Sequence, residues 1–225
     1  MIRRRAAIVA LSVTLLAGLF ALSQVAVRRL EFFRVRAVEI AGIRHLDERD
    51  IVARLAIPAD AHIMTPLGPI AARALTLAGI RQASVTRRWP GTIVVTILEA
   101  PAVALVSDDG QLLVLDDRGG VLPVDPSRLT GSLPLAERDS SVAALLGRLQ
   151  ATDPQWYQLI DRARADGREV RLDAEGREVR LNAEAATQVL LDLGAVREWL
   201  EQHEVPWTFI DARFEGRMFV RKGAA

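Results

Sequence analysis

The sequence of residues 80–102 is IRQASVTRRWPGTIVVTILEAPA. The segments on either side of Trp89-Pro90-Gly91 are rich in β-branched side chains, which suit a pleated, half-buried strand. Proline cannot donate to a ladder and glycine permits a positive φ, so the three central residues predict a turn. Pro101 ends the second strand. The stretch therefore predicts a β-hairpin. Because an isolated hairpin is marginally stable in water, other elements must cover its apolar face.

The residues before the hairpin can supply that cover. Residues 34–40 alternate polar and apolar side chains, as a half-buried strand does, and Gly42 ends this strand. Asp47 is the predicted N-cap of one helix, and Pro69 and Gly79 are predicted to begin and end a second. The apolar stripe of the second helix is expected to contain Ile70, Ala74, Leu75 and Leu77. The resulting order is β-α-α-β-β, in which two helices cover one face of a three-stranded sheet.

The N-terminal region contains an uncharged run over residues 6–27, flanked by arginines on both sides. At about 1.5 Å per residue such a run extends about 33 Å, enough for a bilayer core of about 30 Å. A cleavable signal peptide is the alternative, with a weak cleavage site at Ala21-Leu22-Ser23. We expect an uncleaved transmembrane helix over residues 6–27. The tail of residues 1–5 is then cytoplasmic, and the remainder of the chain lies outside the cytoplasmic membrane.

This combination resembles the POTRA domain of the FtsQ/DivIB family of bacterial cell-division proteins. The resemblance rests on Gly42 after the first strand, on residues 80–93 with their Trp89-Pro90 pair, and on Glu99-Ala100-Pro101-Ala102. The family often has a basic residue at the position of Ala100, so any contact made by that side chain is missing here. The resemblance implies an α+β fold with a POTRA domain over residues 33–101.

Residues 102–222 are expected to form a second domain, a mixed β-sheet with packed helices. A hairpin is predicted around Asp108-Asp109-Gly110. Residues 113–125 are similar to the segment that opens the β domain of the family. Ser140 or Ser141 is expected to cap a helix. The apolar face of that helix is predicted to contain Val142, Leu145, Leu146 and Leu149.

A near-repeat follows, GREVRLDAE and then GREVRLNAE, over residues 167–184. Its alternation predicts an antiparallel hairpin that turns at residues 174–176 and buries the valine and leucine of each copy. The opposite face carries Arg168, Arg171, Arg177 and Arg180, with Glu169 and Glu178 between them. This face is either a functional charged stripe or an ordinary solvated surface.

The C-terminal region predicts a long helix over residues 184–203 and two final strands. The inner stripe of the helix is expected to contain Val189, Leu190, Leu193, Val196, Trp199 and Leu200. The segment Phe209-Ile210-Asp211-Ala212-Arg213-Phe214 resembles a Tyr-Val-Asp-Leu-Arg-Tyr pattern of the same family. This second resemblance, far from the first, supports the same family.

The composition and the sequence motifs argue against an enzymatic function. A net charge of +1 does not favour an electrostatic nucleic-acid binder, and the absence of cysteine excludes disulfides and thiolate sites. The three histidines lack the spacing of metal ligands, and no nucleophile elbow or phosphate-binding loop is present. Trp156 and Tyr157 could form a saccharide platform, but packing on the sheet is the simpler interpretation. We therefore predict no enzyme activity, no cofactor, no metal and no small-molecule substrate.

An interaction surface must then carry the function. In the family, the C-terminal strands receive the partner pair FtsB and FtsL by strand addition, which an edge strand permits. Carried over by position, the resemblance implies a partner-binding site. Its predicted residues are Phe214, Gly216, Met218, Phe219 and Val220. Arg221 and Lys222 flank this strand and either select acidic partners or protect the edge against aggregation.

The resemblance also implies a second surface, on the POTRA domain, that recruits other septal proteins. Arg87 and Arg88 are its most conspicuous polar pair, although a solvated turn flank is an alternative role for them. The predicted function is a single-pass scaffold of the divisome in the cytoplasmic membrane at the septum. It would link early and late division proteins and help to control septal peptidoglycan synthesis. The alternative function is a POTRA-bearing, chaperone-like module for outer-membrane protein biogenesis or secretion.

Overall fold

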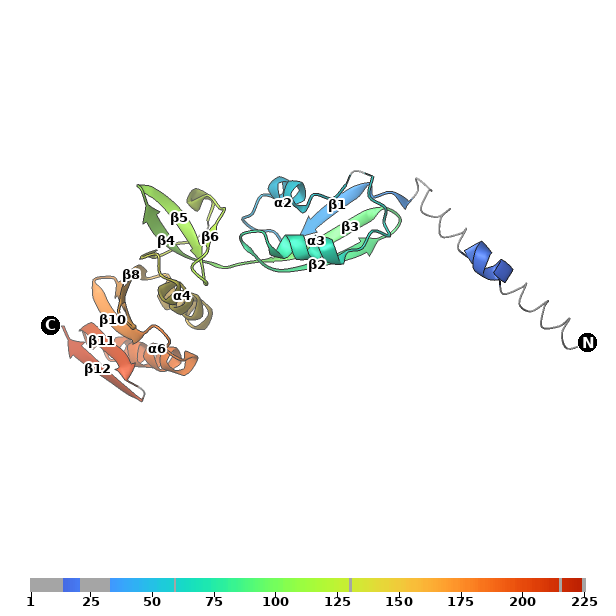
Figure 1. Cartoon of the computed structure of the whole chain (residues 1–225). Helices are drawn as coiled ribbons and strands as arrows, with labels where there is room; N and C mark the ends of the chain where they lie inside the picture. The colour runs from blue at the N-terminus through green and yellow to red at the C-terminus, as the bar shows by residue number, and fades with distance from the viewer. Residues whose placement is uncertain (1–13, 21–32, 59, 130, 215, 224–225) are drawn as a thin grey trace, which may run out of the picture. The chain divides into compact units, whose positions relative to one another are not determined.

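The computed structural model describes residues 14–20, 33–58, 60–129, 131–214 and 216–223. The chain divides into two compact units, one built around residues 47–77 and 82–98 and the other around the residues from Glu99 onward (Figure 1). Of the predicted transmembrane helix over residues 6–27, only residues 14–20 are described, and they are helical; the rest lies outside the described residues. Within the described ranges, no helix is both long and apolar enough to cross a bilayer.

The first unit has the predicted order β-α-α-β-β. Its elements are β1 (Ala37–Ala41), α2 (Glu48–Leu55), α3 (Gly68–Leu75), β2 (Ile80–Arg88) and β3 (Thr92–Glu99). The sheet order is β1-β3-β2, with β1 parallel to β3, and the two helices cover one face of it (Figure 1). Ile51 and Leu55 of α2 and Ile70 of α3 are buried, as are alternate residues of β3. The helices thus supply the apolar cover that the hairpin needs.

Two glycines in this unit are required by close packing. A Cβ at Gly42, where φ is +87°, would overlap the carbonyl oxygen of Ile97. A Cβ at Gly91 would lie 2.5 Å from the carbonyl oxygen of Arg34. The φ of Gly91 is not positive, so the predicted reason for this glycine was wrong. The turn needs glycine because another backbone approaches it closely.

The first helix of the unit begins as predicted, but the second ends earlier. The Asp47 side chain caps α2 by accepting a hydrogen bond from the Arg49 N–H at 2.8 Å. The helix α3 ends at Leu75, so Gly79 is not its C-terminal residue and lies just before β2. Leu75 is also half-exposed, whereas Ile70 and Ala74 are buried. With only eight residues, α3 buries a narrower stripe than the sequence predicted.

Glu99, one of the residues that carry the family resemblance, anchors the loop after β1. Its carboxylate accepts hydrogen bonds from the backbone N–H groups of Arg44 at 2.7 Å and of His45 and Leu46 at 3.1 Å. Partial burial raises the pKa of Glu99, but these hydrogen bonds outweigh that effect and hold its pKa below the usual value. The glutamate therefore has a structural role.

The second unit is a mixed sheet with helices packed on it (Figure 1). Its elements are β4 (Ala102–Asp108), β5 (Gln111–Asp116), β6 (Val121–Leu122), η2 (Pro126–Arg128), β7 (Leu135–Ala136), α4 (Ser140–Thr152), α5 (Pro154–Tyr157), β8 (Ile160–Asp166), β9 (Glu169–Ala174), β10 (Arg177–Asn182), α6 (Thr187–Gln202), β11 (Trp207–Phe214) and β12 (Arg217–Lys222). In the part of the chain that is described, the nine strands have the order β12-β11-β10-β9-β8-β7-β4-β5-β6. Neighbouring strands are parallel at β10–β11, β4–β7 and β7–β8 and antiparallel elsewhere, so the predicted α+β fold with a mixed sheet is confirmed.

The near-repeat forms the predicted hairpin, β9 and β10. Its central Glu175-Gly176 pair has φ values of +50° and +76°, as a tight two-residue turn requires. The valines and leucines of both copies are fully buried; they are Val170, Leu172, Val179 and Leu181. They pack in one core with the apolar face of α4, whose four predicted residues are also fully buried. The alternation of polar and apolar residues therefore predicted correctly which side chains of this hairpin are buried.

Three details of the helices differ from the prediction. The N-cap of α4 is Asp139, not a serine, and its carboxylate accepts hydrogen bonds from the N–H groups of Ser141 and Val142. Trp199 of α6 is 54% exposed and stacks on His203, instead of facing the core. Arg197 is buried in the stripe of α6, where its Nη1 lies 3.2 Å from an Asp153 carboxylate oxygen.

The burial of Arg197 has an identifiable physical basis. Its guanidinium lies over the ring of Trp156, 4.6 Å from the ring centroid, and Asp153 neutralises it. Burial lowers the pKa of Arg197 and the nearby Asp153 opposes this effect. Trp156 and Tyr157 are themselves buried, and the Tyr157 hydroxyl donates to the Val103 carbonyl oxygen at 2.7 Å. These two aromatic residues therefore pack within the core and present no saccharide platform.

Candidate partner-binding edge

The strand β12 forms one end of the nine-stranded sheet (Figure 1). It pairs antiparallel with β11, with Ile210 opposite Val220 and Asp211 opposite Phe219. Among the described residues, no strand pairs with its other side. Such a strand presents backbone N–H and C=O groups that a further strand can bind. The sequence-based expectation located its candidate site here, and the strand has the edge position that the expectation requires.

The side chains of β12 alternate between two environments. Met218 and Val220 are partly buried and pack against the core of the second unit. Phe219 points the other way and is 56% exposed. Because directly opposite residues of a pair share a face, Phe219 lies on the same outer face as Asp211. The Phe219 side chain is therefore accessible to an added strand, whereas the Met218 and Val220 side chains already pack against the core.

Phe214 joins Phe219 at the exposed surface. Phe214 ends β11 and is half-exposed, and its ring meets that of Phe219 edge to face with 5.7 Å between the centroids. Gly216, with φ at +68°, lies in the turn between the two strands. Aromatic side chains that keep this much exposed area are common anchors of protein interfaces. The structure thus brings together two of the five predicted site residues as an exposed aromatic pair.

A shallow hollow of about 300 Å³ adjoins this pair. It lies between α6 and the turn that joins β11 to β12, and it is lined by Val189, Asp192, Val196, Phe214, Gly216, Arg217 and Met218. Its walls combine apolar side chains with one carboxylate and one guanidinium. The hollow offers room for a side chain of a partner that pairs with β12.

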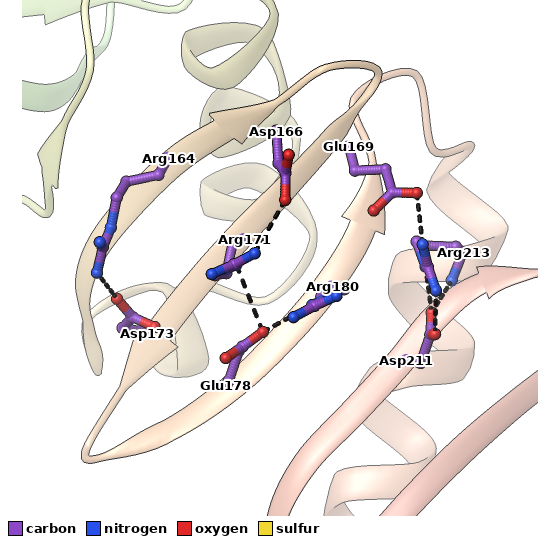
Figure 2. Close-up of polar contacts among 9 residues, drawn as sticks. All are labelled: Arg164, Asp166, Glu169, Arg171, Asp173, Glu178, Arg180, Asp211 and Arg213. Atoms are coloured by element: carbon purple, nitrogen blue, oxygen red, sulfur yellow. Dashed lines mark hydrogen bonds and ion pairs between the residues drawn. The ribbon is translucent and has the colours of Figure 1, made fainter.

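Two arginines of the near-repeat, Arg171 and Arg180, lie among carboxylates on the outer face of the sheet (Figure 2). Arg171 contacts Asp166 at 2.9 Å and Glu178 at 3.5 Å, and Arg180 contacts the same Glu178 at 2.7 Å. Arg164 pairs with Asp173 at 2.7 Å (Figure 2). Exposed ion pairs of this kind contribute little to stability.

The two remaining arginines of the predicted stripe differ from each other. Arg177 lies 3.4 Å from Glu175 and over the ring of Trp207. Arg168 is exposed and has no ion-pair partner among the described residues. Since most of these arginines are neutralised by neighbours, the solvated-surface interpretation fits this face better than a functional charged stripe.

Side chains join the C-terminal half of β11 to β10 and β9. The parallel pairing of β10 with β11 covers only residues 178–180 and 209–211. Beyond it, Asn182 Nδ2 donates to the Arg213 carbonyl oxygen at 2.7 Å, and the Arg213 guanidinium pairs with Glu169 of β9 (Figure 2). These polar contacts add to the burial of Ile210 and Ala212 in holding the β11–β12 hairpin on the sheet.

Arg213 also binds Asp211 on its own strand. Arg213 Nε and Nη2 lie 2.8 and 2.6 Å from the two carboxylate oxygens of Asp211, whose side chain is nearly buried. The hydrogen bonds from Arg213 hold the pKa of Asp211 below its usual range, and the bonds to Asp211 and Glu169 raise the pKa of Arg213. These two residues match the family pattern, and the geometry gives them a structural role in holding the hairpin.

Sequence reasoning missed two residues of this region. Asn182 was treated only as part of the near-repeat, although its amide anchors β11. Phe209 lies beneath two guanidinium groups, those of Arg180 and Arg221, at 5.3 and 5.0 Å from its ring centroid. The parallel pairing of β10 with β11 brings Asn182 and Arg180 to β11, and the β11–β12 pair places Arg221 opposite Phe209. No local pattern could have indicated the pairing of β10 with β11.

The two arginines proposed for recruitment lie on β2 and differ in their contacts. Arg87 donates to the carbonyl oxygens of Ile63 at 2.6 Å and Thr65 at 2.9 Å, so it holds the loop before α3. Arg88 is largely exposed and pairs with Glu39. Of the two, Arg88 is the more accessible to a partner, and its role in recruitment stays a prediction.

The described residues contain no group of three or more histidine, aspartate or glutamate side chains that could hold a metal ion. His45 contacts Glu99 at 3.3 Å, and His203 stacks on Trp199. Both histidines therefore have local structural contacts.

Comparisons with known proteins agree with the fold. Residues 33–100 match the model of the FtsQ-type POTRA domain. The cell division protein FtsQ of Zymomonas mobilis is 35% identical in an alignment of 140 residues that covers 58% of this chain and 42% of that relative. The chain thus spans less than half the length of the curated relative that it matches. The chain therefore contains an FtsQ-type POTRA domain and is similar to a bacterial cell-division protein of that type.

Proposed function

We propose that this protein is a non-enzymatic scaffold of the bacterial divisome. Residues 6–27 anchor it in the cytoplasmic membrane as a single span, and its two folded units lie on the outer side, at the septum. It links early and late division proteins and helps to control septal peptidoglycan synthesis. The POTRA match and the similarity to a cell division protein support the role in division, and the uncharged N-terminal run supports the anchor.

The observation that carries the proposal is the open edge at β12. A partner of the FtsB and FtsL type adds a strand to this edge, so that backbone hydrogen bonds supply affinity. Phe214 and Phe219 then contact alternate side chains of the added strand and supply specificity. Arg217, Arg221 and Lys222 are exposed around the edge. Their charge favours a partner with acidic residues beside its strand.

Capture of the purified FtsB and FtsL pair by the full-length chain tests this site. Phe219→Ala removes an exposed aromatic ring and is expected to weaken capture by about tenfold or more, as loss of an interface anchor does. Leu112→Ala is the matched control, because Leu112 is 50% exposed on β5, at the other end of the sheet. Equal loss of capture in both variants, or in neither, would exclude β12 as the binding edge.

The division role has a separate test. A fluorescent protein fused to the N-terminus is expected to concentrate at mid-cell in dividing cells. A uniform envelope signal would refute the divisome assignment without bearing on the edge geometry.

A further inference from the structure

The two ends of the POTRA unit differ in what they expose. Because β1 runs parallel to β3, with Ala37 opposite Thr92, both strands begin at the same end. The Gly91 carbonyl oxygen accepts hydrogen bonds there from the N–H groups of Arg36 at 2.7 Å and Ala37 at 3.3 Å. We call this the entry end, since the chain enters the unit there at Phe33. Leu98, near the end of β3, lies at the opposite end.

Three segments meet at the entry end. They are the start of the unit at residues 33–36, the β2–β3 turn at residues 89–91, and the loop at residues 61–65. Arg34 and His62 form an isolated β-bridge, and the Val35 N–H donates to the Ala61 carbonyl oxygen at 2.8 Å. The Trp89 ring meets the ring of Phe33 edge to face, 5.6 Å between centroids. These contacts make the entry end a single surface.

Two large apolar side chains project from this surface. Trp89 is more than half exposed, and Met64 is 48% exposed. The loop that carries Met64 is fixed, because Arg87 binds the carbonyl oxygens on both sides of it, those of Ile63 and Thr65. An exposed methionine on a fixed loop and an exposed tryptophan at the same end of the unit give this end apolar side chains that another surface can contact.

The charge around these side chains is mainly positive. The segments that meet here, with β1 and the C-terminal end of β2, carry the exposed residues Arg34, Arg36, Arg87 and Arg88. The carboxylates in the same segments are Glu39, which pairs with Arg88, and Asp60, next to the loop. By formal charge, four arginines against two carboxylates make these segments positive.

The length of the tether restricts what can reach this surface. Residues 28–32 are all that separate the predicted span from Phe33. An extended chain covers at most about 3.6 Å per residue, so Phe33 lies within about 20 Å of the bilayer. This step rests on the proposed membrane anchor. The entry end is therefore the part of the POTRA unit that is held next to lipid.

We infer that the entry end docks on the membrane, with Trp89 and Met64 in the headgroup region and Arg34, Arg36 and Arg88 against anionic lipid headgroups. Tryptophan prefers this amphipathic depth, because its ring is apolar and its N–H is polar. Arginine is attracted to anionic lipids over a short range. Docking fixes the orientation of the POTRA unit on the bilayer, whereas a simple tether leaves that orientation free.

The absence of cysteine makes a site-specific test straightforward. Single cysteines at Met64→Cys and Leu98→Cys carry a fluorescent label in the full-length chain, reconstituted into vesicles of phosphatidylcholine with or without phosphatidylglycerol. Leu98 is the matched control, because it is 53% exposed at the opposite end of the unit. Lipids with a nitroxide at headgroup depth quench labels that lie close to the membrane surface. The label at residue 64 should be quenched at least about twofold more strongly than the label at residue 98 when phosphatidylglycerol is present.

Charge-removing variants test the contribution of the arginines. The double variant Arg36→Gln/Arg88→Gln should reduce the quenching at residue 64, whereas Arg49→Gln, in the first turn of α2 and away from the entry end, should not. Equal quenching at residues 64 and 98 in vesicles that carry the chain would overturn the docking. Strong quenching at residue 64 that does not depend on phosphatidylglycerol would overturn the role of the arginines.

Flotation of the vesicles tests the proposed membrane anchor, on which this inference rests, separately from the docking itself. If the chain does not float with the vesicles, the anchor is absent and the docking inference fails with it. Capture of FtsB and FtsL is measured independently, so a failure at β12 leaves the membrane result unaffected.

Discussion

The two edge strands of the nine-stranded sheet differ in length and in the side chains that they expose. At one end β6 has two residues and pairs only with Val114 and Leu115 of β5. The turn before it is fixed by the Asp116 carboxylate, which accepts hydrogen bonds from the N–H groups of Arg118 at 2.9 Å and Gly120 at 2.7 Å. At the other end β12 has six residues and carries the exposed Phe219.

The difference indicates which edge is available for pairing. Very short edge strands limit unwanted strand addition, and β6 follows that rule. A six-residue edge with an exposed aromatic ring is an aggregation hazard unless it has a partner. The charged residues Arg217, Arg221 and Lys222 moderate the hazard at β12 without removing the edge. The sheet thus limits pairing at one end and leaves the other end able to receive a strand.

Truncation before Arg217 should have the largest effect. It removes β12 and is expected to abolish capture of the FtsB and FtsL pair, while membrane insertion is unchanged. Pull-down from detergent extracts measures capture, and circular dichroism checks the fold, because Met218 and Val220 also pack against the core. Unchanged capture would contradict the assignment of β12 as the binding edge, because the partner would then have to use another surface.

Leu193→Ala tests whether the two ends belong to one cooperative unit. Leu193 is fully buried on α6, so the cavity should reduce the free energy of unfolding by about 3 kcal/mol. Urea denaturation should show one transition with a lower midpoint and an unchanged slope. Two separate transitions would mean that the part of the sheet next to β12 unfolds independently of the part next to β6.

Asp211→Asn tests the polar contacts that hold the β11–β12 hairpin. The pKa of Asp211 is lower in the folded state, so its ionised form stabilises the fold above the unfolded pKa of about 4. That stabilisation is lost as the pH falls through the lower folded value. The variant should therefore be less stable than the wild type at pH 7, by less than Leu193→Ala, and the gap should narrow below about pH 4. Thermal unfolding across this pH range measures the gap, and a constant gap would contradict the assigned role.

Leu112→Ala should have the smallest effect. Its side chain is half-exposed on β5, so stability should change by no more than about 0.5 kcal/mol, and capture should stay at the wild-type level. Isothermal titration with the partner pair measures both affinity and stoichiometry. A clear loss of affinity would show that the β6 end also binds.

Much of the fold could be predicted because its signals are local. The turn pairs Asp109-Gly110 and Glu175-Gly176 have positive φ values, as their residue types suggested. The near-repeat alternates with period two and its apolar residues are fully buried. Such patterns depend on the backbone of a few neighbouring residues, so they can be interpreted without knowledge of the rest of the chain.

The incorrect predictions for the helices arose where more than one residue satisfied the same local rule. Asp139, Ser140 and Ser141 are all good N-caps, and the helix begins after the first of them. Both Trp199 and Arg197 could continue the inner stripe of α6, and Asp153 together with Trp156 selected the arginine. The candidate edge was indicated only through the family resemblance, and nothing in its own residues showed that β12 would be last in the sheet.

The sequence by itself determined the order of the elements, the apolar faces of the strands, the turns and the resemblance to the FtsQ-type POTRA domain. Tertiary structure alone decided which strands became edges, which arginines were neutralised and which aromatic rings stayed exposed. The reason is physical. Alternation and turn chemistry act over a few residues, whereas the parallel pairing of β10 with β11, across the intervening α6, joins segments that no local pattern connects.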